Sequence, residues 1–186
     1  WTENGIRHMT NNKREVKSPE DAKGLKLRTM ENPVHMSAFR SIGVLPTPMS
    51  WPEVFTALQQ GTVDGQENPI GVIASAKLFQ VQKHLTLTGH LYSPAVTLMS
   101  PAAYNKMSEA DRKTIRDLAR EAAAISRKRV EQQEAEGIEM LRKEGMQVKT
   151  LSTEEKAAFQ KAMAPAYKEF AAKFGQANID AISNAK

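Results

Sequence analysis

The chain has 186 residues, of which 40% are hydrophobic and 25% charged, a composition typical of one globular domain or two small ones. It has no cysteine, which excludes disulfides, cysteine-bound zinc and a cysteine nucleophile, and it has no run of about 20 apolar residues that would suggest a membrane span. The net charge is +5, but basic and acidic residues alternate along the chain, so we expect no nucleic-acid partner.

Strand and helix patterns alternate in the first half of the chain. Residues 1–24 are polar, and we expect them to be irregular apart from one helical turn capped by Ser18. In chain order, the following segments then predict a strand at 25–30, a helix at 33–41, an extended segment at 44–49, a helix at 50–61, a short strand at 62–68, a helix from 69 to about 79, strands at 85–90 and 94–100, a long helix at 108–143, a strand at 146–152 and a final helix kinked at Pro165.

Capping residues define several of the expected helix ends. Ser50 and Glu53 fit a capping box at the start of the helix at 50–61. Pro69 fits the first position of the next helix, with Asn68 as its N-cap. The helix at 108–143 is much longer than average and has sparse apolar residues, a pattern typical of a coiled-coil arm or of a strut between two lobes.

Alternating strands and helices predict an α/β fold with an at least partly parallel sheet. In such sheets ligands bind at the carboxyl ends of strands, where this sequence places Arg28 and the segment DGQENP at 64–69. Periodicity alone leaves Arg28 either a solvated edge residue or a fork that grips a carboxylate through two hydrogen bonds. Asn68 either caps its helix only or adds to an anion site at the helix start. Trp51 is either a core residue or a pocket wall.

The sequence gives little support for catalysis or metal binding. Glu67 is a possible general base, but no serine-histidine-aspartate set, lysine-glutamate pair or phosphate-binding loop accompanies it, so we expect no enzyme. A hydrolase that uses Glu67 is only a third hypothesis. The four histidines form no metal-binding motif, although His84 and His90 together are conceivable ligands, so we expect no metal and no cofactor.

Several motifs make the sequence resemble one family closely: GLKLRTM at 24–30, PTPMSW at 46–51, LQQGTVDGQENP at 58–69, YSPAVTLMS at 92–100 and MSEADRKTIRDLAREAA at 107–123. They resemble the DctP-type substrate-binding proteins of TRAP transporters, the tripartite ATP-independent periplasmic transporters, and the resemblance covers essentially the whole chain. It implies a periplasmic, two-lobed protein of the Venus-flytrap type. Such a protein binds a small organic acid between its lobes and delivers it to membrane permease subunits.

The resemblance also implies roles for individual residues. Arg28 is expected to form a bidentate salt bridge with the ligand carboxylate, Asn68 to add a hydrogen bond and Trp51 to line the pocket. The expected minor contributors are Arg7 or His8 as a second basic residue, Tyr92 as a weaker pocket candidate, and Asp64 and Glu67 as residues that bond nearby backbone or orient Arg28. On this interpretation DGQENP is both a ligand clamp and a turn, in which Gly65 permits a tight backbone conformation.

The chain resembles only the C-terminal part of family members, so the N-terminal lobe is expected to be largely missing. The start at Trp1, without a methionine, indicates processing or a missing first part. The expected organisation is lobe two at 1–92, a crossover strand and short helix of lobe one at 93–107, a helix spanning both lobes at 108–145, and a C-terminal strand and helices at 146–186. The alternative function is a helical interaction module that binds no ligand and forms a homodimer because lobe one is absent.

Overall fold

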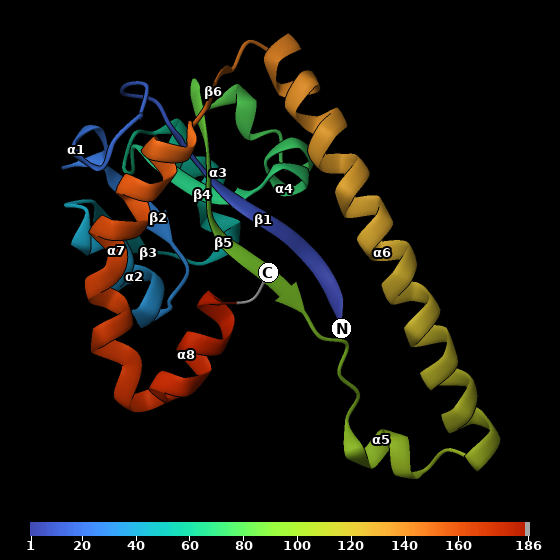
Figure 1. Ribbon diagram of the computed structural model, residues 1–186. Helices are drawn as coiled ribbons and strands as arrows, with labels where there is room; N and C mark the ends of the chain where they lie inside the picture. The colour runs from blue at the N-terminus through green and yellow to red at the C-terminus, as the bar shows by residue number, and fades with distance from the viewer. Residues whose placement is uncertain (185–186) are drawn as a thin grey trace.

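The computed structural model describes residues 1–184 and arranges them around one mixed six-stranded sheet (Figure 1). Its strands are β1 (Thr2–Asn11), β2 (Lys26–Thr29), β3 (Leu45–Pro48), β4 (Gly65–Pro69), β5 (His84–Ala95) and β6 (Gln147–Thr150). Its helices are α1 (Pro19–Ala22), α2 (Pro33–Ser41), α3 (Trp51–Gln59), α4 (Ile70–Ser75), the 3₁₀ turn η1 (Leu78–Gln80), α5 (Pro101–Asn105), α6 (Glu109–Lys143), α7 (Thr153–Phe174) and α8 (Gln176–Ser183). Residues 185–186, at the end of the expected C-terminal segment, lie outside the described residues. The predicted α/β class is confirmed.

The sheet has the strand order β3-β2-β4-β1-β5-β6. Strand β2 runs parallel to β3 and β4, and β5 runs parallel to β6, whereas β1 is antiparallel to both of its neighbours. The sheet is therefore partly parallel, as expected. Strand β3 lies at one edge, which suits Pro46 and Pro48 because a proline has no N–H for a second neighbouring strand.

Strand β1 shows that the expectation of an irregular segment at 1–24 is wrong. It occupies Thr2–Asn11 and lies between β4 and β5 near the middle of the sheet. Its buried half is polar, with Arg7, His8 and Thr10 all enclosed, so it lacks the apolar alternation from which a strand is normally predicted. Each of these three side chains has a hydrogen-bond partner in the fold, which makes their burial tolerable.

Strand β5 corrects the expectation of two separate strands at 85–90 and 94–100. It runs without interruption from His84 to Ala95, and residues 96–100 lie outside it. Strand β6 pairs only with its first four residues, His84–Leu87. Pro94 therefore lies on a stretch that pairs with β1 alone, where a missing N–H is tolerated.

The helix ends agree with the capping residues at some positions and differ at others. Ser108 caps α6, and Ser152 forms a full capping box at the start of α7. The predicted capping box at α3 is wrong, because the Ser50 side chain makes no capping hydrogen bond. The predicted cap at α4 is also wrong, because Asn68 belongs to β4 and Pro69 is the N-cap. Within residues 1–184, no helix is both long enough and apolar enough to cross a membrane.

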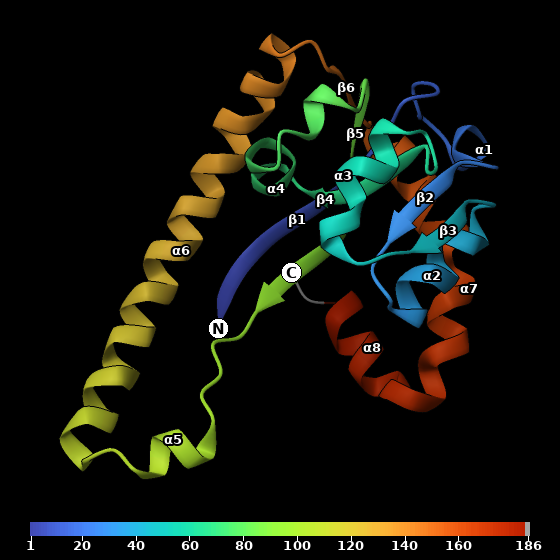
Figure 2. The ribbon, with the colours of Figure 1, turned by 180° about the vertical axis from the view of Figure 1, so that it is seen from behind.

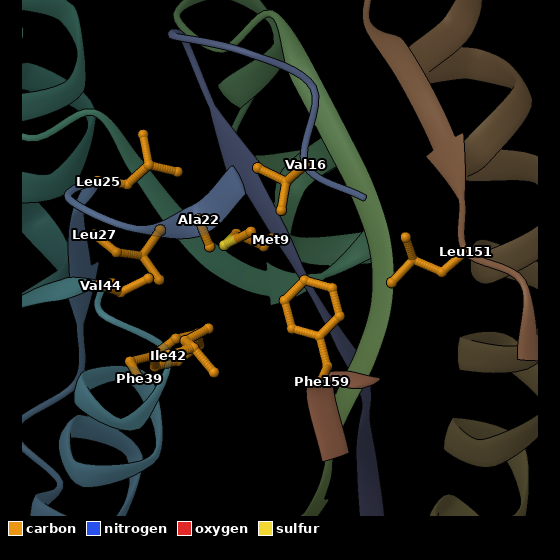
Figure 3. Packing of buried hydrophobic residues seen from close by; sticks show 10 residues of the cluster. All are labelled: Met9, Val16, Ala22, Leu25, Leu27, Phe39, Ile42, Val44, Leu151 and Phe159. Atoms are coloured by element: carbon orange, nitrogen blue, oxygen red, sulfur yellow. The ribbon is translucent and has the colours of Figure 1, made fainter. Parts of the chain in front are cut away.

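Two apolar clusters hold the helices on opposite faces of the sheet. On one face α1, α2 and α7 cover a cluster that includes Met9, Leu27 and Phe159, whose side chains turn toward one another in Figure 3. On the other face the cluster joins α3, α4 and α6 and includes Ile70 and Leu141. Each fully buried side chain of this size contributes about 1.5–3 kcal/mol through removal from water. The strands are thus fixed from both sides, and so are the positions of side chains at their ends.

Helix α6 confirms the predicted long helix. It has 35 residues and therefore a length of about 50 Å. Its C-terminal half packs closely on the sheet side, where a Cβ at Gly137 would lie 2.5 Å from Ile70 Cγ2. Its N-terminal half extends away from the sheet toward α5 and exposes Leu118 and Ile125 (Figures 1 and 2). The expectation that this helix spans both lobes stays a prediction.

Candidate functional site

Five of the predicted site residues lie on β1, β2 and β4, which are adjacent in the sheet: Arg7, His8, Arg28, Glu67 and Asn68. In register, Arg28 of β2 lies beside Gln66 of β4, and His8 of β1 lies opposite Asn68. Because side chains alternate along a strand, Arg28, Asn68 and His8 share one face of the sheet, and Arg7 and Glu67 share the other. The structure therefore divides the predicted residues into two groups on opposite faces of the same strands.

Arg28 is a buried cation that is held by backbone rather than by a carboxylate. Its side chain is 4% exposed, and its Nε and Nη2 donate to the Met49 carbonyl oxygen at 3.0 and 2.7 Å. Among residues 1–184, no aspartate or glutamate forms a salt bridge with it. Burial lowers the pKa of Arg28, Glu67 opposes this through its negative charge, and Arg7 adds to it through its positive charge. A buried cation without a carboxylate partner is costly, so this position favours an incoming anion.

Trp51 lies against Arg28. The Arg28 Cζ atom is 5.6 Å from the centre of the Trp51 ring, a distance typical of a cation–π contact. Trp51 occupies the first turn of α3 and is 42% exposed. Its ring therefore lies beside the guanidinium, partly exposed, and is not part of the core. Of the two interpretations that the sequence left open for this residue, the core position is wrong, and the role of a pocket wall stays a prediction.

Arg7, Glu67 and His90 form a second group. Arg7 Nε and Nη2 donate to the two Glu67 carboxylate oxygens at 2.6 and 2.8 Å, and Nη2 also donates to the Glu67 carbonyl oxygen at 2.7 Å. His90 Nε2 lies 3.1 Å from Glu67 Oε2, and His90 Nδ1 lies 2.7 Å from Thr88 Oγ1. Burial raises the pKa of Glu67, but hydrogen bonds from His90 and Arg7 outweigh that effect and lower the pKa to about 2. Glu67 is therefore ionised and fully engaged, a poor state for a general base.

This geometry corrects the predicted role of Glu67. It does not orient Arg28; its carboxylate holds Arg7 through a bidentate pair. The positive charge of Arg7 is therefore paired with Glu67, whereas Arg28 forms no salt bridge with any residue of 1–184. The two arginines on neighbouring strands thus differ in what they can still bind.

Asn68 and His8 lie opposite each other on β4 and β1. Asn68 Nδ2 donates to Gln66 Oε1 at 2.6 Å, and the residue is 6% exposed. His8 Nδ1 accepts from the Gly89 backbone N–H at 3.1 Å, and its Nε2 lies 3.0 Å from Glu134 Oε1 on α6. Burial lowers the pKa of His8, and the hydrogen bond to Glu134 opposes this. His8 thus connects the sheet to α6.

Residues 65–69 of the segment DGQENP form strand β4, and the expected tight turn at Gly65 is wrong. Gly65 belongs to β4, and a Cβ there would lie 2.0 Å from the Thr10 carbonyl oxygen, so glycine is required by the close approach of β1. The Asp64 carboxylate accepts from the Lys26 backbone N–H at 2.9 Å, which confirms the expected bond to neighbouring backbone.

Tyr92 lies apart from both groups. It pairs with Ile6 on β1, is 54% exposed, and its hydroxyl has no hydrogen-bond partner in the part of the chain that the structure describes. Its role as a pocket residue stays a prediction.

A cavity of about 400 Å³ lies beside the second group, between α2, β5, α7 and α8. Its walls are mostly apolar, with Phe39 and Met163 among them, and His35 and His90 are its imidazole members. The Nδ1 atom of His35 is buried without a partner in the described residues. Because neither Arg28 nor Asn68 lines this cavity, it is separate from the buried cation. No group of three metal-binding side chains occurs within residues 1–184.

Sequence reasoning missed several residues that shape these groups. Met49 contributes a backbone carbonyl, which no side-chain pattern reveals. Gln66, Thr10 and Gln82 form a buried hydrogen-bonded chain that continues from Asn68. His90, which the sequence offers only as a conceivable metal ligand, belongs instead to the Arg7 group, where its Nε2 lies 3.1 Å from Glu67 Oε2.

Comparison with known proteins gives the family. Residues 1–173 match DctP, the bacterial extracellular solute-binding protein family 7. The chain belongs to this family. A TRAP periplasmic solute-binding protein from Polaromonas sp. JS666, solved bound to D-erythronate, is 57% identical with a TM-score of 0.95, and the match covers 100% of this chain and 61% of that one. The DctP-type resemblance and the fold of periplasmic solute-binding proteins are thereby confirmed.

Two curated relatives support the same assignment. A "Solute-binding protein" from Verminephrobacter eiseniae is 54% identical over 186 residues, which are 100% of this chain and 55% of that protein. The 2,3-diketo-L-gulonate-binding periplasmic protein YiaO of Escherichia coli is 40% identical over 150 residues, which are 81% of this chain and 46% of that protein. The chain of this DctP-family member thus spans about half the length of these relatives.

Proposed function

We propose that this DctP-family chain is the carboxylate-binding part of an extracytoplasmic solute receptor that delivers a small organic acid to a TRAP membrane permease. The observation that carries the proposal is the buried Arg28 guanidinium, which has no carboxylate partner among residues 1–184. The relatives support it, because one was solved with D-erythronate and another is named for binding 2,3-diketo-L-gulonate, both small acids. The 2,3-diketo-L-gulonate-binding relative YiaO is also named as periplasmic, which supports a periplasmic location.

The free edge of Arg28 suits a carboxylate. A guanidinium has five N–H groups, and the two on the Nε side bind the Met49 carbonyl oxygen. The remaining edge, formed by Nη1 and the second N–H of Nη2, presents two parallel donors that match the two oxygens of a carboxylate. The Trp51 ring limits rotation of the guanidinium and shields it from water on one side. The carboxylate then supplies the negative charge that the buried cation lacks.

The remaining site residues have supporting roles in this proposal. Asn68 adds a hydrogen bond to the acid, and Arg7 stays rigid because both carboxylate oxygens of Glu67 accept from it.

The lobes of the receptor follow the expected organisation in this proposal. Residues 1–92 with 146–186 form one lobe, 93–107 belong to the other lobe, and the helix at 108–145 spans both. Closure of the lobes around the acid by a hinge motion excludes water from the Arg28 pair. Binding rather than chemistry is the whole task, since the engaged Glu67 offers no free base.

Calorimetric titration with D-erythronate tests the role of Arg28. The protein titrated is the full-length product of the gene. Arg28→Ala is expected to weaken binding at least a hundredfold, because loss of one partner from a buried charged pair costs about 3–5 kcal/mol. Arg28→Lys keeps the charge but loses the fork, so an intermediate loss is expected. Retention of wild-type affinity by Arg28→Ala would refute the proposal.

Arg112→Ala is the matched control. Arg112 also lies over an aromatic ring, that of Tyr104 at 5.3 Å, and donates from Nε and Nη2 to the backbone carbonyl oxygens of Tyr104 and Asn105. It repeats the local geometry of Arg28 outside the site, so its loss is expected to leave D-erythronate binding unchanged. The rival expectation of a dimerisation module without ligand is not favoured, since the relatives are named for solute binding.

A further inference from the structure

A chain of buried side-chain hydrogen bonds runs from Gln82 to Asn68 across β1 and β4. Gln82 Nε2 donates to the carbonyl oxygens of Val81 at 2.9 Å and Asp64 at 3.4 Å. Its Oε1 accepts from Thr10 Oγ1 at 2.6 Å, Thr10 accepts from Gln66 Nε2 at 3.0 Å, and Gln66 Oε1 accepts from Asn68 Nδ2 at 2.6 Å. These four side chains are the members of what we call the amide relay: Gln82, Thr10, Gln66 and Asn68. All four are buried.

The direction of every bond in the amide relay follows from its first member. Val81 and Asp64 present carbonyl oxygens, which only accept, so the Gln82 atom that faces them must be its nitrogen. Gln82 therefore turns its oxygen to Thr10, whose single hydroxyl hydrogen is used in the 2.6 Å bond; a 3.5 Å contact to the Gln66 carbonyl is too long to compete.

Thr10 can then only accept from Gln66, which must turn its nitrogen to Thr10 and its oxygen to Asn68. The Asn68 atom at that end is consequently its nitrogen. A flip of the Asn68 amide would bring two oxygens together at hydrogen-bond distance. The relay thus fixes one orientation of Asn68 without any contribution from a ligand.

The fixed amide leaves two groups of Asn68 available. Its Oδ1 and one N–H of Nδ2 have no hydrogen-bond partner within residues 1–184. Asn68 lies on the same face of the sheet as Arg28, one pleat further along the neighbouring strand, because Arg28 is in register with Gln66. An acceptor and a donor are therefore held next to the cation that we propose as the carboxylate anchor.

We propose that Gln82, Thr10 and Gln66 are positioning residues that hold Asn68 Oδ1 as a hydrogen-bond acceptor, and that the receptor thereby prefers 2-hydroxy acids to 2-oxo acids. This inference rests on the proposed function, in which Arg28 binds the carboxylate. The hydroxyl at C2 of a 2-hydroxy acid donates to Asn68 Oδ1. The carbonyl at C2 of a 2-oxo acid has no hydrogen to donate to Oδ1, and because the relay fixes the amide, the free N–H of Nδ2 cannot move to the position that Oδ1 occupies.

Displacement of D-erythronate from the protein as its gene encodes it provides the test. The competitors are the two enantiomers of 2-hydroxybutanoate and, separately, 2-oxobutanoate, which differ only at C2. The wild type is expected to bind the better 2-hydroxy enantiomer about tenfold or more tightly than the 2-oxo acid. In the complex with the 2-oxo acid, two acceptors face each other, so they form no hydrogen bond although both have given up their water. The readout is the dissociation constant of the 2-oxo acid divided by that of the 2-hydroxy acid, because a purely structural defect weakens the binding of both acids alike.

Thr10→Val interrupts the amide relay while keeping the shape of the side chain, and it is expected to bring the ratio close to one. Thr10→Ser restores the hydroxyl and should restore the ratio. The matched control is Thr29→Val on β2, since the Thr29 hydroxyl is also fully buried but has no partner in the described residues. Its ratio should equal that of the wild type. If Thr10→Val does not fold, Gln66→Met removes the same relay at another point and should lower the ratio likewise.

The outcomes separate this inference from the proposed function. Failure of the wild type to bind D-erythronate would remove the proposed function and this inference with it. Binding of both acids with a wild-type ratio near one, or an unchanged ratio in Thr10→Val and Gln66→Met, would overturn the inference alone. A ratio that falls in both relay variants and stays high in Thr29→Val supports it.

Discussion

Replacement of Glu67 by glutamine isolates the charge of the buried carboxylate that holds Arg7. Glutamine keeps the shape of the side chain but cannot neutralise Arg7 or accept equally well from His90. The pKa of Glu67 is about 2 in the folded protein against an ordinary value of 4.5, a difference that corresponds to about 3 kcal/mol of stability at neutral pH. Glu67→Gln is therefore expected to lower the free energy of unfolding at pH 7 by about 3 kcal/mol.

The pH dependence of this contribution has a definite sign. The unfolded chain takes up a proton on Glu67 near pH 4.5, whereas the folded protein resists protonation until the pH approaches 2. The stabilisation is complete above pH 4.5 and is lost as the pH falls through this window. Urea unfolding followed by circular dichroism should be measured at pH 7 and at steps down to pH 3. The free energies of unfolding of the wild type and of Glu67→Gln should converge as the pH falls.

An exposed carboxylate provides the matched control for this measurement. Glu53 lies on α3 and is exposed, so Glu53→Gln should leave the free energy of unfolding within about 0.5 kcal/mol of the wild type. If Glu67→Gln is as stable as Glu53→Gln at pH 7, or if its stability falls with pH as steeply as that of the wild type, the reasoning about the Arg7 group is refuted.

Two further predictions concern stability and can be checked by the same urea unfolding. Gly65→Ala should be severely destabilised or fail to fold, because its Cβ would lie 2.0 Å from the Thr10 carbonyl oxygen, whereas Gly61→Ala, with open space around it and a φ of +71°, should lose only about 1 kcal/mol. Similar stabilities for the two would contradict the close strand approach. Ser152→Ala should cost about 1 kcal/mol because it removes a capping box, and Ser50→Ala should cost less because Ser50 makes no capping hydrogen bond. Equal losses would argue against the capping geometry.

The sequence predicted those parts of the fold that have a regular apolar period or a strong cap. The long helix and the extended segment with its two prolines both follow from local rules. The place of Arg28 at the end of a parallel strand also follows, because LKLRTM alternates clearly and an α/β sheet collects ligands at that edge.

Residues whose neighbours are distant in the sequence could not be placed in the same way. Strand β1 is polar on its buried half, so its pattern resembles a loop, and only the partners on β4 and α6 explain its burial. The pairing of Glu67 with Arg7 instead of Arg28 depends on which face of the sheet each residue occupies, and that needs the register of three strands. The amide relay joins residues up to 72 positions apart and leaves no local trace.

The most direct test of the central claim is a crystal structure of the protein, as its gene encodes it, with D-erythronate bound. The account predicts that the acid's carboxylate oxygens lie about 2.7–2.9 Å from Nη1 and Nη2 of Arg28, while Nε remains bonded to the Met49 carbonyl. A carboxylate bound elsewhere, such as in the cavity lined by His35 and His90, with the Arg28 fork left free of the acid, would contradict it.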